Sequence, residues 1–178
     1  MRFSAATVLA LGFGTSAVVC GALTRGASAS DADAKAVLAR GRYLVVYGNC
    51  NECHTPGWRE SDGKLPQAQW LTGNRIGFRG DWGTSYPVNL RLEFQALGED
   101  QWVLAVRTRG GHPPMTWHDL RVLNAADRHA IYAFIKSLGP AGVPAPAAVP
   151  PWREPATRYI ETRSRTPATA FPIPKENS

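Results

Sequence analysis

Two cysteines and a histidine stand close together in this chain, as Cys50, Cys53 and His54. A C-x-x-C-H arrangement is the attachment pattern of c-type haem, in which each thiol adds to one vinyl group of the porphyrin as a thioether. The imidazole of His54, directly after the second cysteine, would then be the proximal ligand of the iron. The motif therefore predicts one covalently bound haem c.

A C-x-x-C pair has other uses, and each meets an objection here. A thioredoxin-like redox pair follows a strand and opens a helix, whereas the residues before Cys50 have a helical pattern and those after Cys53 form a Gly- and Pro-rich loop. A structural zinc site needs a second pair of ligands, but the only other cysteine, Cys20, lies in an N-terminal segment with the features of a targeting signal. These observations favour haem over a redox pair, a zinc site or a disulfide.

The distal side of the iron has one main candidate ligand. Met115 is the only methionine beyond the initiator, and it lies in the proline-stiffened segment 111–116. A thioether there would give His/Met ligation, which raises the reduction potential and favours Fe(II). His112 is the alternative distal ligand, and we expect the two further histidines, His118 and His129, to lie at the surface.

The N-terminus predicts export. Arg2 precedes an uncharged, mostly apolar run over residues 5–23, and the small residues 27–29 fit a cleavage site, so residues 1–29 are interpreted as a signal peptide. An uncleaved membrane anchor is the alternative, because the run is nearly long enough to span a bilayer. Either reading places the rest of the chain in the periplasm.

The remaining chain of about 150 residues is expected to form one domain. Removing Arg2 and Arg25 lowers the formal net charge from +6 to +4, and the basic residues are scattered. This mild positive charge favours a protein partner with an acidic surface. It gives no indication of nucleic-acid binding.

Three helices are predicted. The first covers residues 31–47, where Gly41 suggests that another helix crosses closely. The last begins at Asn124, whose side chain can cap the amide of Asp127, and ends before Gly139. A third is expected over residues 99–108. These elements predict an all-α fold.

The stretch 55–97 has no sustained period. Its aromatic and aliphatic residues are expected either to wrap the haem or to pack against each other; they are Trp58, Trp70, Leu71, Ile76, Phe78, Trp82 and Tyr86. His54 is expected to donate its second ring N–H to a backbone carbonyl in the following loop, with Pro56 and Pro66 as candidates.

The tail over residues 141–178 is rich in proline and cannot be a long helix. It is interpreted as a partly disordered extension, as an extended strap, or as a docking segment for a partner complex. The anchors of a strap would be Trp152, Tyr159, Ile160 and Phe171.

The order of helix, C-x-x-C-H motif, wrapped loops, Pro-Pro-Met and terminal helix resembles class I cytochrome c. Residues 41–44, 54–56, 71–73, 89–90 and 113–117 are similar to single modules of the cytochrome subunits of membrane-bound alcohol and gluconate dehydrogenases. The likeness covers about residues 34–140, and this chain has one haem motif where those subunits have three. The resemblance implies thioether attachment at Cys50 and Cys53 and axial ligation by His54 and Met115.

Two functions are consistent with these features. The first is a periplasmic electron carrier that passes electrons between a dehydrogenase and a respiratory acceptor, with a signal peptide over residues 1–29, a cytochrome c domain over 30–140 and a tail over 141–178. In that case no residue is catalytic. The alternative is a peroxidase-like haem enzyme or a gas sensor, in which Met115 is absent from the iron or easily displaced and His112 assists at an open face.

Overall fold

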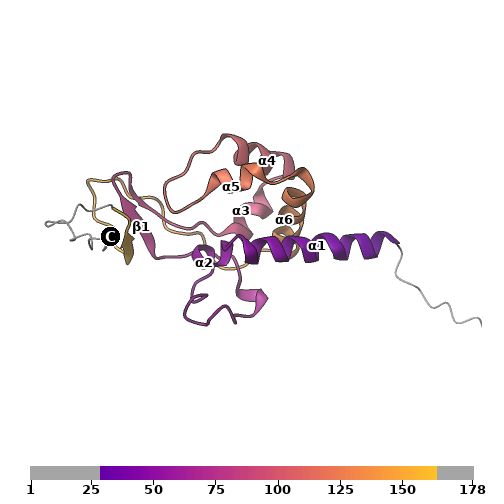
Figure 1. Cartoon of the computed structure of the whole chain (residues 1–178). Coiled ribbons are helices and arrows are strands. Elements are labelled where there is room, and N and C mark those ends of the chain that lie inside the picture. The colour runs from indigo at the N-terminus through magenta and orange to yellow at the C-terminus, as the bar shows by residue number, and fades with distance from the viewer. Residues whose placement is uncertain (1–28, 164–178) are drawn as a thin grey trace, which may run out of the picture.

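A computed structural model of the chain describes residues 29–163 and shows a helical part joined to a small sheet (Figure 1). The expected signal peptide and the end of the tail lie outside the described residues. The helices are α1 (Ala29–Tyr47), α2 (Cys50–His54), α3 (Leu90–Ala96), α4 (Glu99–Thr108), α5 (Trp117–Val122) and α6 (Ala125–Ser137). The strands are β1 (Gly77–Gly80), β2 (Gly83–Ser85) and β3 (Tyr159–Glu161).

Helix α1 crosses α6 at Gly41, as the glycine predicted. A Cβ at this position would overlap the carbonyl oxygen of Ala130 and would lie 2.6 Å from the Cβ of Phe134. The side chain of Asn124 accepts the amide of Asp127 at 2.7 Å, which confirms the expected start of α6. Arg40 adds an ion pair to Asp127 at 2.7 Å, so the two helices are joined by packing and by charge.

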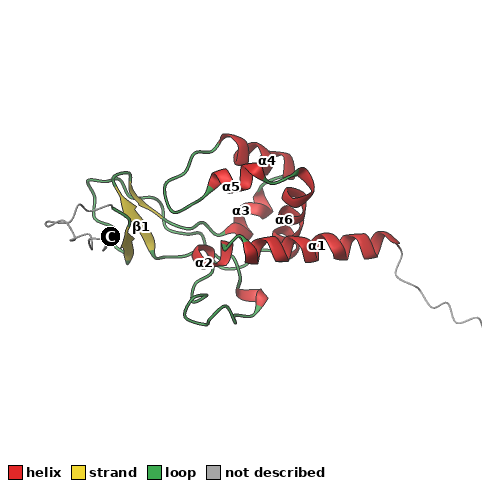
Figure 2. Cartoon of the chain, viewed as in Figure 1, coloured by secondary structure: helices red, strands yellow, loops and turns green. Residues whose placement is uncertain are grey.

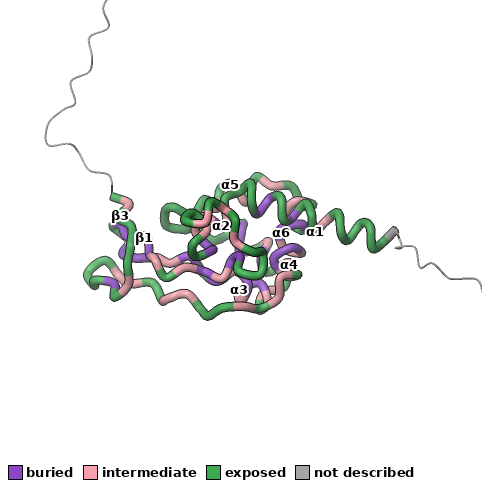
Figure 3. Tube along the Cα trace, turned by 90° about the horizontal axis from the view of Figure 1, so that it is seen from below, coloured by how far each residue is buried: buried purple, intermediate pink, exposed green. Residues whose placement is uncertain are grey.

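The hydrophobic core lies between α1, α3, α4, α6 and the segment around Trp70. Helix α4 has the predicted bounds, and Trp102 and Val106 are buried. In α1, Val45 is fully buried and Leu44 is buried, whereas Tyr43 and Val46 are exposed. The buried hydrophobic residues cluster in the helical half, and Figure 3 shows further buried segments, in purple, at the sheet.

The expectation of an all-α fold is wrong in detail, because the described residues are mostly helical but include a three-stranded mixed sheet (Figure 2). Strand β1 is central; it pairs antiparallel with β2 and parallel with β3. The strands have three or four residues each, too few for an alternating pattern to stand out in the sequence. Helix α3, also missed, has only seven residues.

The first part of the Pro-rich tail runs along the domain as a strap over residues 141–163, and β3 is its last element. Its backbone contacts hold it: Val149 and Thr84 exchange hydrogen bonds at 2.7 and 2.8 Å, and Asn89 donates to the Ala141 carbonyl at 2.8 Å. Of the expected anchors, Trp152 and Ile160 do not hold it, because they are 83% and 50% exposed, whereas the ring of Tyr159 lies under the Arg79 guanidinium, 5.5 Å from its centroid. Phe171 lies outside the described residues.

No helix within residues 29–163 is both long enough and apolar enough to cross a membrane.

Candidate functional site

The single-turn helix α2 carries both cysteines and His54. It follows α1 after a bend at Asn49, whose φ of 55° lies in the left-handed region and redirects the chain. Cys50 and Cys53 are free thiols, each half-buried. Burial raises the pKa of the Cys50 thiol to about 11 and also raises the pKa of Cys53, where Glu52 adds to the effect. Both thiols are therefore neutral near pH 7, unlike the thiolate of a reactive redox pair.

The orientation of His54 is fixed by a hydrogen bond from its ring. Nδ1 lies 2.8 Å from the carbonyl oxygen of Val88, and because a carbonyl only accepts, Nδ1 carries the proton. Burial lowers the pKa of His54, while the Val88 bond and Glu93 act in the opposite direction. A neutral ring in this tautomer keeps a lone pair on Nε2, the atom that can bind a metal.

The acceptor for His54 was expected in the following loop, and a backbone carbonyl does accept, but the candidates Pro56 and Pro66 were wrong. Val88 lies 34 residues beyond His54, directly before the N-cap of α3. Its carbonyl belongs to the irregular segment between β2 and α3, outside any helix or strand. Nothing in the side chain of Val88 signals this role, so sequence patterns could not have identified it.

A buried hydrogen-bond chain, which the sequence did not indicate, joins α2 to the loop after it. Thr55 Oγ1 donates to Asn51 Oδ1 at 2.6 Å and accepts the amide of Leu71 at 2.8 Å. The amide of Gly73 donates to the carbonyl of His54 at 2.8 Å. All of these residues are buried, so the position of α2 is set from within the protein.

Met115 is placed apart from α2 in the sequence, in the segment between α4 and α5. Figure 1 shows this segment above α2. Residues 109–116 are all exposed, and Met115 is 40% exposed. Arg121 ties the segment to α4 by donating to the carbonyls of Val106 and Arg109 at 3.1 and 2.7 Å.

Each of the other histidines has a neighbour of its own. The ring of His112 stacks on Trp82, with centroids 5.2 Å apart and planes inclined by 2°. His118 pairs with Asp119 at 3.1 Å, and His129 pairs with Glu99 at 2.9 Å. His118 and His129 are exposed, as expected.

The aromatic residues of the stretch 55–97 are divided between two surroundings. The rings of Trp58 and Trp70 pack edge to face with their centroids 5.1 Å apart, and Trp70 also packs against Phe134 in the core. For these two residues the packing alternative was correct. Trp82 is different: it belongs to the turn between β1 and β2, and its Nε1 is buried with no hydrogen-bond partner among the described residues.

Within residues 29–163, no group of three or more His, Cys, Asp or Glu side chains could hold a metal ion. One cavity of about 350 Å³ borders Val88 and Glu93, next to the carbonyl that orients His54. A scan against protein-family models, a search of curated proteins and a search of solved structures each gave no significant match.

Proposed function

We propose that this protein is an electron carrier with one haem c, attached through Cys50 and Cys53 and ligated by His54 and Met115. The observation that carries the proposal is the hydrogen bond from His54 Nδ1 to the Val88 carbonyl. It fixes the ring on the helical turn that also bears two free thiols, and it leaves Nε2 for iron. A histidine that binds a metal commonly donates its other ring N–H to a carbonyl in this way, which fixes the orientation of the ring.

The residues present fit a haem in three respects. The thiols are neutral and unpaired, so both remain free to form thioethers. Met115 and Val88 are apolar residues that are 40% and 43% exposed, and a porphyrin could cover them. The buried Nε1 of Trp82 has no partner among the described residues, and a donor in that state suits a carboxylate such as a haem propionate.

When bound, the haem supplies a one-electron Fe(III)/Fe(II) couple. The chain's contribution is to hold the imidazole in one tautomer, to keep α2 rigid through Thr55, and to present a thioether on a loop. A His/Met pair favours the reduced iron more than two histidines would. In this proposal no side chain transfers a proton to a substrate.

The partners proposed are redox proteins, with electrons passing from a dehydrogenase to a respiratory acceptor in the periplasm. A net charge of +4 after removal of residues 1–29 favours an acidic partner surface. Faster reduction by the partner at low ionic strength than at high ionic strength would support this proposal. A rate independent of salt would contradict it.

The test of the haem proposal is the mass and visible spectrum of the exported protein, oxidised and reduced, with and without carbon monoxide. We expect the mass of one covalent haem, a low-spin spectrum with a far-red sulfur-to-iron band, and no change with the gas. His54→Ala should lose low-spin ligation, whereas the matched variant His118→Ala should keep it, because His118 is exposed and pairs with its neighbour Asp119.

The alternative function is a peroxidase-like enzyme or a gas sensor. High-spin iron, ready binding of carbon monoxide or peroxidase turnover above that of denatured haem would favour it over the carrier. The absence of haem from a correctly exported protein would reject both functions.

A further inference from the structure

We propose that the β1–β2 hairpin restrains the loop that carries Met115, with Trp82 as a positioning residue and the C-terminal strap as its support. The part of this inference that concerns iron ligation rests on the proposed function. The restraint of the loop itself concerns only the protein chain and can be measured separately.

The contact between hairpin and loop is the stack of Trp82 on His112. The ring centroids are 5.2 Å apart and the planes are nearly parallel, at 2°. His112 is coupled to Met115 by a turn, since the Met115 amide donates to the His112 carbonyl at 3.2 Å. A movement of His112 therefore changes the position of Met115.

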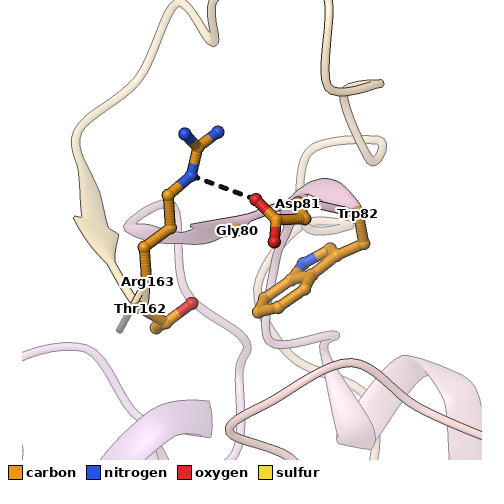
Figure 4. Close-up of a pocket in the computed structure, with 5 residues that line it drawn as sticks. All are labelled: Gly80, Asp81, Trp82, Thr162 and Arg163. Carbon is orange, nitrogen blue, oxygen red and sulfur yellow. Dashed lines mark ion pairs between the residues drawn. The ribbon is translucent and has the colours of Figure 1, made fainter. Parts of the chain in front are cut away.

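Trp82 is held firmly within its hairpin. Its indole covers Gly80, where a Cβ would overlap the ring, and β1 and β2 pair on either side of it. Figure 4 shows Trp82 beside Asp81, which pairs with Arg163 at 3.4 Å across a cavity of about 320 Å³. The ring is thus presented to His112 by a constrained turn.

The strap fixes the hairpin to the rest of the molecule. Arg79 of β1 is 9% exposed and donates to the carbonyls of Arg153 and Pro151 at 3.0 and 3.2 Å. The same guanidinium donates to Thr84 of β2 at 3.0 Å. Gly83, with φ of 99°, packs against the Val149 carbonyl, where a side chain would overlap. The hairpin cannot move without disrupting these contacts.

The loop has few other restraints. Residues 109–116 are all exposed, so burial contributes little to their position. Arg121 bonds the loop to α4, Arg109 pairs with Glu93 of α3 at 2.6 Å, and Trp117 of α5 packs against Gly111; these contacts all stay within the helical part. Among the described contacts, the Trp82 stack is the one that joins the loop to the sheet. Its loss should allow the segment before Met115 to open more often.

The first measurement is hydrogen–deuterium exchange of the Met115 amide, which donates to the His112 carbonyl, in the full-length exported protein. Trp82→Ala should raise its exchange rate about two- to tenfold, the range expected for losing one aromatic pair, and Trp82→Phe should restore most of the protection. Trp152→Ala is the matched control, because Trp152 lies on the strap but is 83% exposed. Equal exchange rates in the Trp82→Ala and Trp152→Ala proteins would contradict the proposal that Trp82 restrains the loop.

His112→Ala removes the same stack from the exposed side and avoids any folding defect of the hairpin variant. It should reproduce the effect of Trp82→Ala, and the double variant should exchange no faster than either single variant. If the two substitutions raise the exchange rate additively, the contact between the Trp82 and His112 rings is not the cause of the protection.

The second measurement is binding of imidazole to the oxidised protein, followed by loss of the far-red band. Trp82→Ala should bind imidazole about two- to tenfold more tightly than wild type, because Met115 is displaced more easily, while Trp152→Ala should match wild type. Faster exchange without tighter imidazole binding would overturn the ligand-positioning role. A wild-type protein without haem would reject the proposed function, and the exchange experiment would still decide whether the hairpin restrains the loop.

Discussion

At the scale of single residues, the candidate site depends on groups that would not themselves bind the haem but that hold its ligands in place. The Val88 carbonyl selects the tautomer of His54, and Thr55 connects α2 to Leu71. The three residues of the C-x-x-C-H motif could be identified from their spacing. Their supports could not, because a backbone carbonyl has no sequence signature and a threonine is common in loops.

Thr55 gives the first prediction at this scale. Thr55→Val keeps the shape of the side chain but leaves Asn51 Oδ1 and the Leu71 amide without their partner in a buried region. The free energy of unfolding should fall by about 1–3 kcal/mol, the cost of unsatisfied buried polar groups. Urea titration of the purified protein, monitored by far-UV circular dichroism, measures this change.

Two variants test whether the hydroxyl is the cause. Thr55→Ser retains the oxygen and should recover most of the loss. Thr72→Val makes the same substitution nearby, at a threonine whose hydroxyl makes a long hydrogen bond of 3.4 Å to the Gln69 carbonyl. It should change the free energy of unfolding by less than about 0.5 kcal/mol. Equal destabilisation at both threonines would contradict the role of Thr55.

At the scale of elements, the long helices were predictable and the short ones were not. Asn124, Gly139 and the apolar spacing between them specify α6, and a glycine within α1 predicted the crossing. Helix α3 is too short to show a period, and its start at Asn89 is stabilised partly by the strap, 52 residues away. Local patterns cannot report a contact of that sequence separation.

The helix crossing gives a second prediction. Gly41→Ala should destabilise the protein although alanine favours helix by about 1 kcal/mol. The added Cβ would overlap the Ala130 carbonyl and lie 2.6 Å from the Phe134 Cβ, so α1 and α6 would have to separate. A net loss of about 1–3 kcal/mol is expected by thermal or urea unfolding. Gly110→Ala is the control, because no atom lies within 4 Å of its added Cβ; a stabilised Gly41→Ala protein would show that the crossing is loose.

At the scale of the whole molecule, the described chain has a helical part with the hydrophobic core and a sheet part held mainly by polar contacts. The core residues belong to α1, α3, α4, α6 and the segment around Trp70, whereas the sheet depends on Arg79 and on backbone pairing with the strap. The composition of the tail predicted that it would not be a long helix. It could not predict β3, because β3 forms only by pairing with a strand 82 residues earlier.

This division predicts that the strap can be released while the helical part stays folded. Arg79→Ala removes the buried guanidinium that binds the carbonyls of Pro151 and Arg153, and each lost bond to a charged group is worth about 1.5–3 kcal/mol. Trypsin should therefore cleave after Arg153 or Arg158 at least about tenfold faster, since cleavage follows the population of the open strap. Arg75→Ala, at an exposed position two residues before the start of β1, removes a trypsin site and a charge from the same region and should leave the rate unchanged. The thermal transition of the helices should shift little in either variant; cooperative loss of the whole fold in Arg79→Ala would instead mean that strap and helical core unfold as one unit.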